Sequence, residues 1–374
     1  MRSLLRTFAN GRLRAQVVKE FLSILRDPRS RLVVFAPPLL QLVIFTFATT
    51  LEVRNAHIAV LDRDAGRWSH ELVARAGAAD FVSEVHAVHS RDELRELIDG
   101  RKVIAGLDMG PDFSRNIASG GAGTVQVIAD GRRSNASQIT VGYLNTIAAG
   151  VGADARGDLR SASPVVVRNW FNPNLIYRWF VVPALSGILV FFSALMITAL
   201  SIARERELGT FDQLLVSPTT TPEIIVAKTM PAMAIGVSLG LMMIAAARLV
   251  FGIPFEGSFW LLLPSLLLFI LSVVGIGLMV SSVSSTQQQA ILGSFAIGVP
   301  AVLMSGFGTP VENMPMVLQW MAQAIPLTHF LIIVEGTFLK AMPASDVVAN
   351  TWPLALIALV TLAAATVFVR SRLQ

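Results

Sequence analysis

The sequence predicts an α-helical polytopic membrane protein of six transmembrane helices, with one α/β extracytoplasmic domain inserted between the first and second spans. Hydrophobic residues make up 53% of the 374 residues and charged residues only 15%, against about 25% charged in a typical soluble domain. A helix needs roughly 20 apolar residues to cross a bilayer, and several runs approach that length. We expect the spans at residues 32–51, 180–202, 231–251, 259–283, 290–307 and 352–369.

Basic residues concentrate at the N-terminus and indicate the orientation of the chain. Residues 1–31 hold eight lysine and arginine residues against two acidic ones, while the formal net charge of the whole chain is +5. Lysine and arginine are retained on the cytoplasmic side of a membrane, and Arg370 and Arg372 favour the same side for the C-terminus. We therefore expect both termini in the cytoplasm. Arginine greatly outnumbers lysine, which suggests a high-GC bacterial genome, so the expected location is a bacterial cytoplasmic (inner) membrane.

The segment 1–31 has the pattern of an amphipathic helix lying on the membrane surface. Apolar residues recur at i, i+3, i+4 and i+7 from Val18, and basic side chains lie off that stripe. The pI of about 10.2 would also permit nucleic-acid binding, but the stripe favours the lipid bilayer as partner, and we expect no nucleic acid. The residues that define this interfacial helix are Lys19, Glu20, Phe21, Arg26, Asp27 and Pro28, with Asp-Pro ending it.

Residues 52–178 are too many for a connecting loop and have the composition of a soluble domain. Stretches typical of strands alternate there with helical ones, which predicts a small α/β sandwich. Ser90 and Glu93 have the spacing of a capping box at the start of one helix. The expected strands are 57–61, 81–86, 102–107, 124–128 and, leading back to the membrane, 164–170; the expected helices are 69–79, 92–101 and 135–151.

No metal site is expected in this domain. The chain has no cysteine, which excludes thiolate ligands and disulfides. The domain contains His57, His70, His86 and His89. His86 and His89 are spaced i, i+3 on a predicted strand and its exit, so they point to opposite faces. Because no acidic cluster completes a ligand set in the sequence, we interpret these residues as ordinary domain histidines.

A compact charged element, residues 204–228, follows the second span and is expected in the cytoplasm. Charged residues at 204–207 continue the helix into water with pairs at i, i+3, and the next helix starts with Thr221 as N-cap. Apolar residues at 211, 214 and 215 form a short exposed face, which implies a partner. The element comprises Arg204, Glu205, Arg206, Glu207, Gly209, Thr210, Phe211, Leu214, Leu215, Pro218, Glu223 and Lys228.

The region 311–341 separates the last two expected spans. It contains two short apolar pieces, 315–324 and 326–339, each too short to cross a bilayer. We expect them to form interfacial or re-entrant helices on the outer side of the membrane. The residues that mark this region are Asn313, Pro315, Pro326, His329 and Glu335.

Motifs along nearly the whole chain point to one family. They are Lys-Glu-Phe-Leu-Ser-Ile-Leu-Arg-Asp-Pro-Arg at 19–29, Trp-Phe-Asn-Pro-Asn at 170–174, the Arg-Glu-Arg-Glu…Gly-Thr…Leu-Leu…Pro pattern at 204–218, Thr-Gln-Gln-Gln-Ala at 286–290 and Asn-Met-Pro at 313–315. Together they resemble the ABC type-2 permeases, the membrane subunits of ATP-driven exporters. In that family the charged pattern docks on the ATPase. Glu335 stands where an arginine is commoner in the family.

The resemblance implies a permease subunit that dimerises and forms the translocation pathway with a second permease subunit, in a homodimer or a heterodimer. It also implies an ABC ATPase subunit as partner. A nucleotide-binding P-loop needs a Gly-Lys pair, and none of the lysines here follows a glycine. We therefore expect no enzyme activity and no bound cofactor in this chain, with ATP and Mg held by the partner ATPase.

Two functions remain open at this level. The first is the exporter permease, and the second is a membrane-anchored sensor or scaffold whose extracytoplasmic domain binds a ligand. A sensor would need a cytoplasmic effector domain or signalling linker, and the short cytoplasmic segments favour the permease. The expected spans contain Arg248 as their only charged residue, which argues against an ion-coupled carrier. The sequence does not indicate the substrate: drugs, lipids, lipid-linked glycans and small peptides all remain open.

Overall fold

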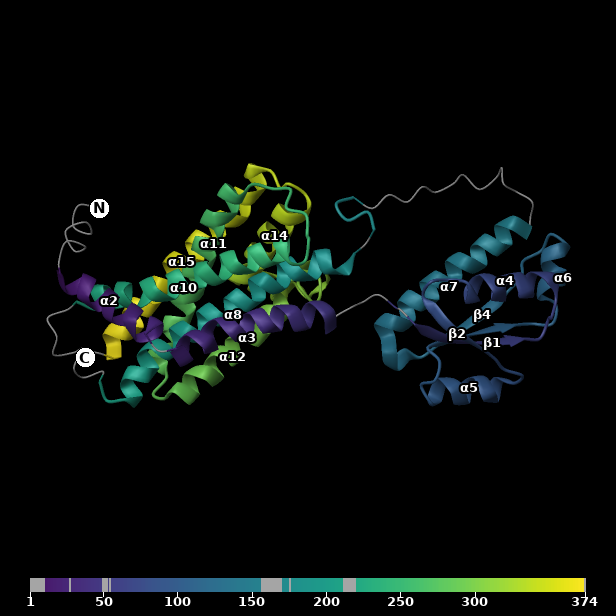
Figure 1. Cartoon of the computed structure of the whole chain (residues 1–374), viewed down its shortest axis with the longest axis horizontal. Helices are drawn as coiled ribbons and strands as arrows, with labels where there is room; N and C mark the ends of the chain where they lie inside the picture. The colour runs from purple at the N-terminus through teal and green to yellow at the C-terminus, as the bar shows by residue number, and fades with distance from the viewer. Residues whose placement is uncertain are drawn as a thin grey trace. The chain divides into compact units, whose positions relative to one another are not determined.

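The structure, a computed structural model, describes residues 11–26, 28–48, 53, 55–155, 170–174, 176–210 and 220–372 (Figure 1). The chain divides into two compact units. The first comprises Met1–Ala48 and Asn169–Gln374, and the second is Thr49–Arg168. The second unit is one continuous segment, whereas the first is built from two.

The first unit is a bundle of helices. Four of them are long and apolar enough to cross a membrane: α8 (Tyr177–Glu207), α10 (Thr221–Leu249), α11 (Phe259–Val283) and α15 (Ala344–Arg372). Two further helices, α13 (Met316–Gln323) and α14 (Pro326–Leu339), are apolar enough as a pair but are bent by 77° at the break between them. The described ranges thus provide four candidate spans, or five if this pair crosses as one. The bundle also contains α2 (Gly11–Leu25), α3 (Pro28–Ala48) and α12 (Gln287–Met304).

Two of the expected spans occupy slightly different residues in the structure. α3 begins at Pro28 and its last described residue is Ala48, so residues 49–51 of the expected span lie outside the described residues; Pro37 and Pro38 inside the helix each remove a backbone hydrogen bond. α12 ends at Met304 rather than at 307, because Gly306 adopts a φ of +94° that a helix cannot continue through. The six-span topology therefore stays a prediction, while the polytopic helical class is established.

α8 lies at the centre of the bundle, where it contacts α3, α10, α11, α12 and α14. It is hydrophobic all round, the pattern of a helix that is buried on every side. Phe191 of α8 packs on Phe269 of α11, and the Phe269 ring stacks on Phe330 of α14 with centroids 4.2 Å apart. A Cβ added at Gly277 of α11 would lie 2.7 Å from the Cβ of Thr198 on α8. The glycine therefore allows the two helices to approach closely.

The second unit is built on a four-stranded sheet with the order β2-β1-β3-β4. Its strands are β1 (Ala56–Asp62), β2 (Val82–Ala87), β3 (Ala105–Met109) and β4 (Val125–Ala129). β1 pairs in parallel with β2 and with β3, and β4 runs antiparallel to β3. In Figure 1, α4 (Arg67–Gly77), α6 (Phe113–Ala118) and α7 (Ser134–Ala155) cover one face, and α5 (Arg91–Asp99) covers the other. Each face of the sheet has its own hydrophobic core, and alternate residues of β1 contribute to the two cores. Ile58 and Val60 face α4 and α7, and Ala59 and Leu61 face α5.

The elements of this unit differ from the expected ones mainly at their ends. β3 starts at Ala105, three residues later than expected, because Arg101 takes a φ of 56° in the turn that leaves α5. Ser90 caps α5 as expected, accepting from the amide of Glu93. The reciprocal bond differs, since the Glu93 carboxylate accepts from the amide of His89 rather than from that of Ser90. The strand expected at 164–170 lies outside the described residues except for its last position.

Candidate functional site

The charged element expected at 204–228 begins on the last turn of α8. This helix runs five residues past the expected span end at 202 and stops after Glu207, where Leu208 caps it and Gly209 adopts a φ of +69°. Residues 211–219 are outside the described part of the chain, and the expected apolar face of Phe211, Leu214 and Leu215, with Pro218, falls there. The structure therefore locates both flanks of the element.

An ionic cluster around the buried Lys228, consisting of Lys19, Glu20, Glu205 and Lys228, joins three helices at this end of the bundle. The Lys228 side chain on α10 is only 3% exposed, and its Nζ lies 2.9 Å from Glu205 Oε2 of α8 and 3.5 Å from Glu20 Oε1 of α2. Nζ also donates to the carbonyl of Ser201 at 3.3 Å. Lys19 Nζ lies 3.4 Å from the other oxygen of Glu205. A buried lysine is tolerated only when it is paired in this way, so the cluster locks α2, α8 and α10 together.

The neighbouring charged residues of α8 reach two further helices. Arg206 donates to the carbonyls of Ser282 and Ser284 at the end of α11, at 2.7 and 3.2 Å. The Glu207 carboxylate accepts from the amide of Gln287 at the start of α12, at 2.7 Å. These contacts join α8 to its neighbours, and the i, i+3 pairs expected from the sequence stay a prediction. The end of α8 is tied to α2, α10, α11 and α12.

The start of α10 corrects one detail of the sequence analysis. The N-cap is Thr220, not Thr221. The Glu223 carboxylate accepts from the amide of Thr220 at 2.8 Å, which is the reciprocal contact of a capping box and needs a spacing of three residues. Glu223 is therefore the residue that determines where this helix begins.

The interfacial helix α2 packs on α10 and on α3. α2 ends at Leu25 and α3 begins at Pro28, which places the break where Asp-Pro predicts it; Asp27 itself is outside the described residues. Phe21 is half-buried and Arg26 is exposed. Val18 and Leu22, two members of the expected apolar stripe, are exposed in the bundle. These two side chains are therefore available for contact with lipid.

The two short helices at 316–339 differ sharply in burial. α13 exposes Met316 and Trp320, whereas α14 is buried along nearly its whole length, between α8, α11 and α15. Pro326 starts α14, and the ring Nε2 of the buried His329 lies 2.9 Å from the carbonyl of Gln323. Burial inside the bundle favours the re-entrant over the interfacial interpretation for α14. Asn313 ends a short 3₁₀ turn, Pro315 precedes α13, and Glu335 is half-buried on α14.

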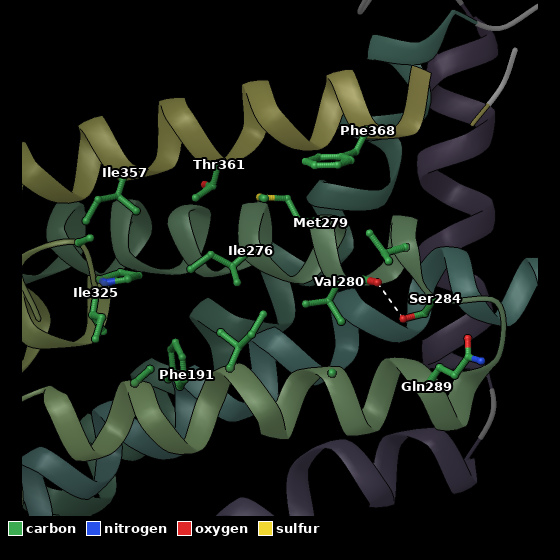
Figure 2. Close-up of a pocket in the computed structure, with 16 residues that line it drawn as sticks. Phe191, Ile276, Met279, Val280, Ser284, Gln289, Ile325, Ile357, Thr361 and Phe368 are labelled. Carbon is green, nitrogen blue, oxygen red and sulfur yellow. Dashed lines mark hydrogen bonds between the residues drawn. The ribbon is translucent and has the colours of Figure 1, made fainter. Parts of the chain in front are cut away.

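An apolar cleft of about 730 Å³ opens between α12 and α15, with α11 as its floor (Figure 2). Ile276 and Met279 come from α11, and Thr361 and Phe368 point in from α15. The lining is hydrophobic except for a few polar groups, among them Ser284 and Gln289 toward one end, the composition that ligand pockets share. That end adjoins the α11–α12 turn to which Arg206 and Glu207 bind. Sequence analysis missed this cleft and these turn contacts, because no local pattern signals which helices pack together.

Comparisons with known proteins identify relatives over nearly the whole length. Residues 30–367 match the family described as ABC-2 family transporter protein. The probable multidrug ABC transporter permease YbhR of Escherichia coli K12 is 40% identical over 369 residues, which cover 97% of this chain and 99% of that protein. The probable multidrug ABC transporter permease YbhS of the same organism is 28% identical over 338 residues, 88% of each chain. The inner membrane transport permease YhhJ is 27% identical over 336 residues, 85% of this chain and 86% of that one.

Proposed function

Because the chain belongs to the ABC-2 transporter family as a membrane permease subunit, we propose that it works as a dimer driven by a separate ATPase that docks beside the end of α8. The observation that carries this proposal is the ionic cluster around the buried Lys228. It holds both flanks of the segment 211–219 against the bundle through Glu205 and Lys228. A partner that pushes on this segment therefore acts on a firmly anchored part of the molecule.

The contacts of α8 can transmit a displacement of the segment 211–219 to other helices of the bundle. Arg206 binds the end of α11 and Glu207 binds the start of α12, while Ser281 Oγ accepts from the amides of Ile202 and Ala203. Tilting the end of α8 must then move the α11–α12 turn, because rigid helices and hydrogen bonds transmit displacement. This turn lies at one end of the apolar cleft. ATP and Mg belong to the ATPase in this mechanism, and the permease changes shape.

We also propose the membrane arrangement expected from the charges. Six spans place both termini in the cytoplasm, with α3 and α12 completing the set and α13–α14 forming the outer re-entrant region. The unit Thr49–Arg168 then lies on the extracytoplasmic side. The basic N-terminal segment supports this orientation. A second permease subunit, identical or a sister chain, shares the pathway.

Apolar small molecules are the substrate class that the cleft supports best. Its walls offer almost no hydrogen-bonding groups for glycans or peptides, and unsatisfied polar groups on a ligand cost free energy there. The relatives YbhR and YbhS are named probable multidrug permeases, which agrees with a pocket that selects by hydrophobicity. The docking proposal does not depend on this assignment.

Co-purification tests the docking proposal. A Phe211→Ala/Leu214→Ala/Leu215→Ala variant is compared with the wild type after mild detergent extraction from native membranes. We expect the wild type to carry a P-loop ATPase and the variant to lose most of the associated ATP hydrolysis. The matched control, Leu249→Ala/Val250→Ala, removes exposed apolar side chains near the opposite end of α10 and should keep the ATPase. A wild type without ATPase, or a variant that keeps it in full, would contradict the proposal.

A further inference from the structure

Two histidines and a glutamate meet on the sheet of the second unit. His57 lies on β1, and Glu84 and His86 lie on β2. His57 Nδ1 is 3.2 Å and His86 Nε2 is 3.7 Å from the same oxygen, Glu84 Oε2. The ligand atoms of the three residues all lie within 4.8 Å of one another. The two imidazole rings stack with centroids 5.9 Å apart.

The parallel register of β1 and β2 produces this arrangement. His57 pairs with Glu84 and Ala59 pairs with His86, after a register shift between Ala56 and His57. Residues i and i+2 of a strand share a face, so Glu84 and His86 point to the same side as His57. In the sequence, His86 has His89 three residues away on the opposite face of the predicted strand, and no acidic cluster adjoins them. The neighbouring strand supplies the second histidine, and the acidic partner lies two residues away on the same strand.

We propose that His57, Glu84 and His86 bind a divalent transition-metal ion of the zinc type. A zinc ion takes imidazole nitrogens and carboxylate oxygens at about 2.0–2.2 Å, so neighbouring ligand atoms in a tetrahedral site lie roughly 3.3–3.6 Å apart. The separations of 3.2 and 3.7 Å between the ligand atoms lie just below and just above that range. Small side-chain rotations suffice to form the site.

Partial exposure leaves such an ion accessible. The side chains of His57, Glu84 and His86 are 43, 54 and 31% exposed, so the site opens to solvent. Three protein ligands leave at least one coordination position free. Water, or a donor group of another molecule, takes that position. The ion would also bridge β1 to the edge strand β2. Metal binding should therefore slow the opening of the backbone hydrogen bonds between these two strands.

Zinc titration of the full chain tests the site. The tag-free protein in nanodiscs is titrated with Zn²⁺ against a chromophoric chelator, beside His57→Asn and His86→Asn variants. We expect one tight site per chain in the wild type, and affinity lower by roughly tenfold or more in each variant, since each loses one ligand. His70→Asn and His89→Asn remove exposed histidines outside the cluster and should bind like the wild type.

Hydrogen exchange provides a second readout that does not depend on affinity. Zn²⁺ should slow amide exchange in 82–87 of the wild type and leave it unchanged in the His86→Asn variant. Two results would overturn the proposal. One is the absence of a stoichiometric zinc site in the wild type, and the other is equal affinity in the wild type and in both cluster variants.

Discussion

At the residue scale, Asp108 shows how one buried carboxylate organises the second unit. Its side chain is 1% exposed on β3 and pairs with Arg63 at 2.6 Å and Arg91 at 2.8 Å. Burial alone would raise the pKa of Asp108, but the hydrogen bonds from Arg63 and Arg91 outweigh it and hold this pKa below its usual value of 3.8. The carboxylate connects the loop after β1 and the start of α5 to β3.

The lowered pKa predicts the direction of a pH effect. A carboxyl whose pKa is lower in the folded state stabilises that state above its unfolded pKa, and this stabilisation is lost as the pH falls through the folded value. Amide exchange in β3, corrected for intrinsic rates, should therefore accelerate in the wild type as the pH drops from about 5 to 3. Asp108→Asn should exchange faster already at neutral pH and depend less on pH. Asp112→Asn, at an exposed aspartate on the same unit, is the control, and an identical pH profile in both variants would refute the role of Asp108.

At the element scale, the ends of helices rather than their middles carry the specific interactions. Between Arg178 and Arg204, α8 has no charged residue, and in its last turn Glu205, Arg206 and Glu207 bind four other helices. Two apolar helices can shift along each other with little loss of contact. A charge pair, in contrast, is favourable only when its two groups lie within a few ångströms of each other. The ionic cluster therefore determines how α2, α8 and α10 are placed relative to one another.

Replacing Lys228 tests the ionic cluster. Lys228→Met removes the buried cation and leaves the partly buried Glu205 and Glu20 with only the exposed Lys19, which should cost up to about 3 kcal/mol of stability. We expect a lower melting temperature in nanodiscs and loss of the ATPase association. The double variant Lys228→Met/Glu205→Gln removes the unpaired charge and should recover part of the melting temperature. If the single variant melts like the wild type, the cluster does not stabilise the junction of α2, α8 and α10.

At the scale of the whole molecule, the proposed function requires a link between the ends of several helices and the cleft between two of them. α12 and α15 both lie against α11, and the space between them remains open (Figure 2). The α11–α12 turn belongs to both the cleft and the α8 contacts. In the proposed function, this shared turn connects the segment 211–219 to the cleft.

Filling the cleft should impair transport. Ala301 of α12 is 6% exposed and lines the cleft, so Ala301→Phe places a ring in that space. We expect uptake of a lipophilic fluorescent dye into inverted vesicles to fall several-fold. Leu292→Phe, on an exposed part of α12 away from the cleft, should transport like the wild type. If Ala301→Phe transports the dye as fast as the wild type, at equal protein level and melting temperature, then the cleft is not part of the translocation pathway.

Much of the fold and part of the candidate site follow from local sequence. The long apolar runs predict α8, α10, α11 and α15, because crossing a bilayer requires a minimum helical length. Alternation and capping predict the strands and α5 within a few residues, since these signals act over neighbouring positions. The family motif around Arg204 indicates the docking element before any contact is known. The location of Phe211, Leu214 and Leu215 on a docking face stays a prediction.

The sequence by itself determined the membrane class, most helices and the family. The length of an apolar run, the periodicity of a helix and the spacing of a motif each depend on residues that are close together in the chain. Only the tertiary structure decided which groups meet across long stretches of chain. Lys228 finds Glu20 more than 200 positions away, and His57 meets Glu84 and His86 through a strand register that a bulge shifts by one residue. The cleft between α12 and α15 depends in the same way on how helices pack around α11. Such contacts follow from the packing of whole elements, which no short stretch of sequence encodes.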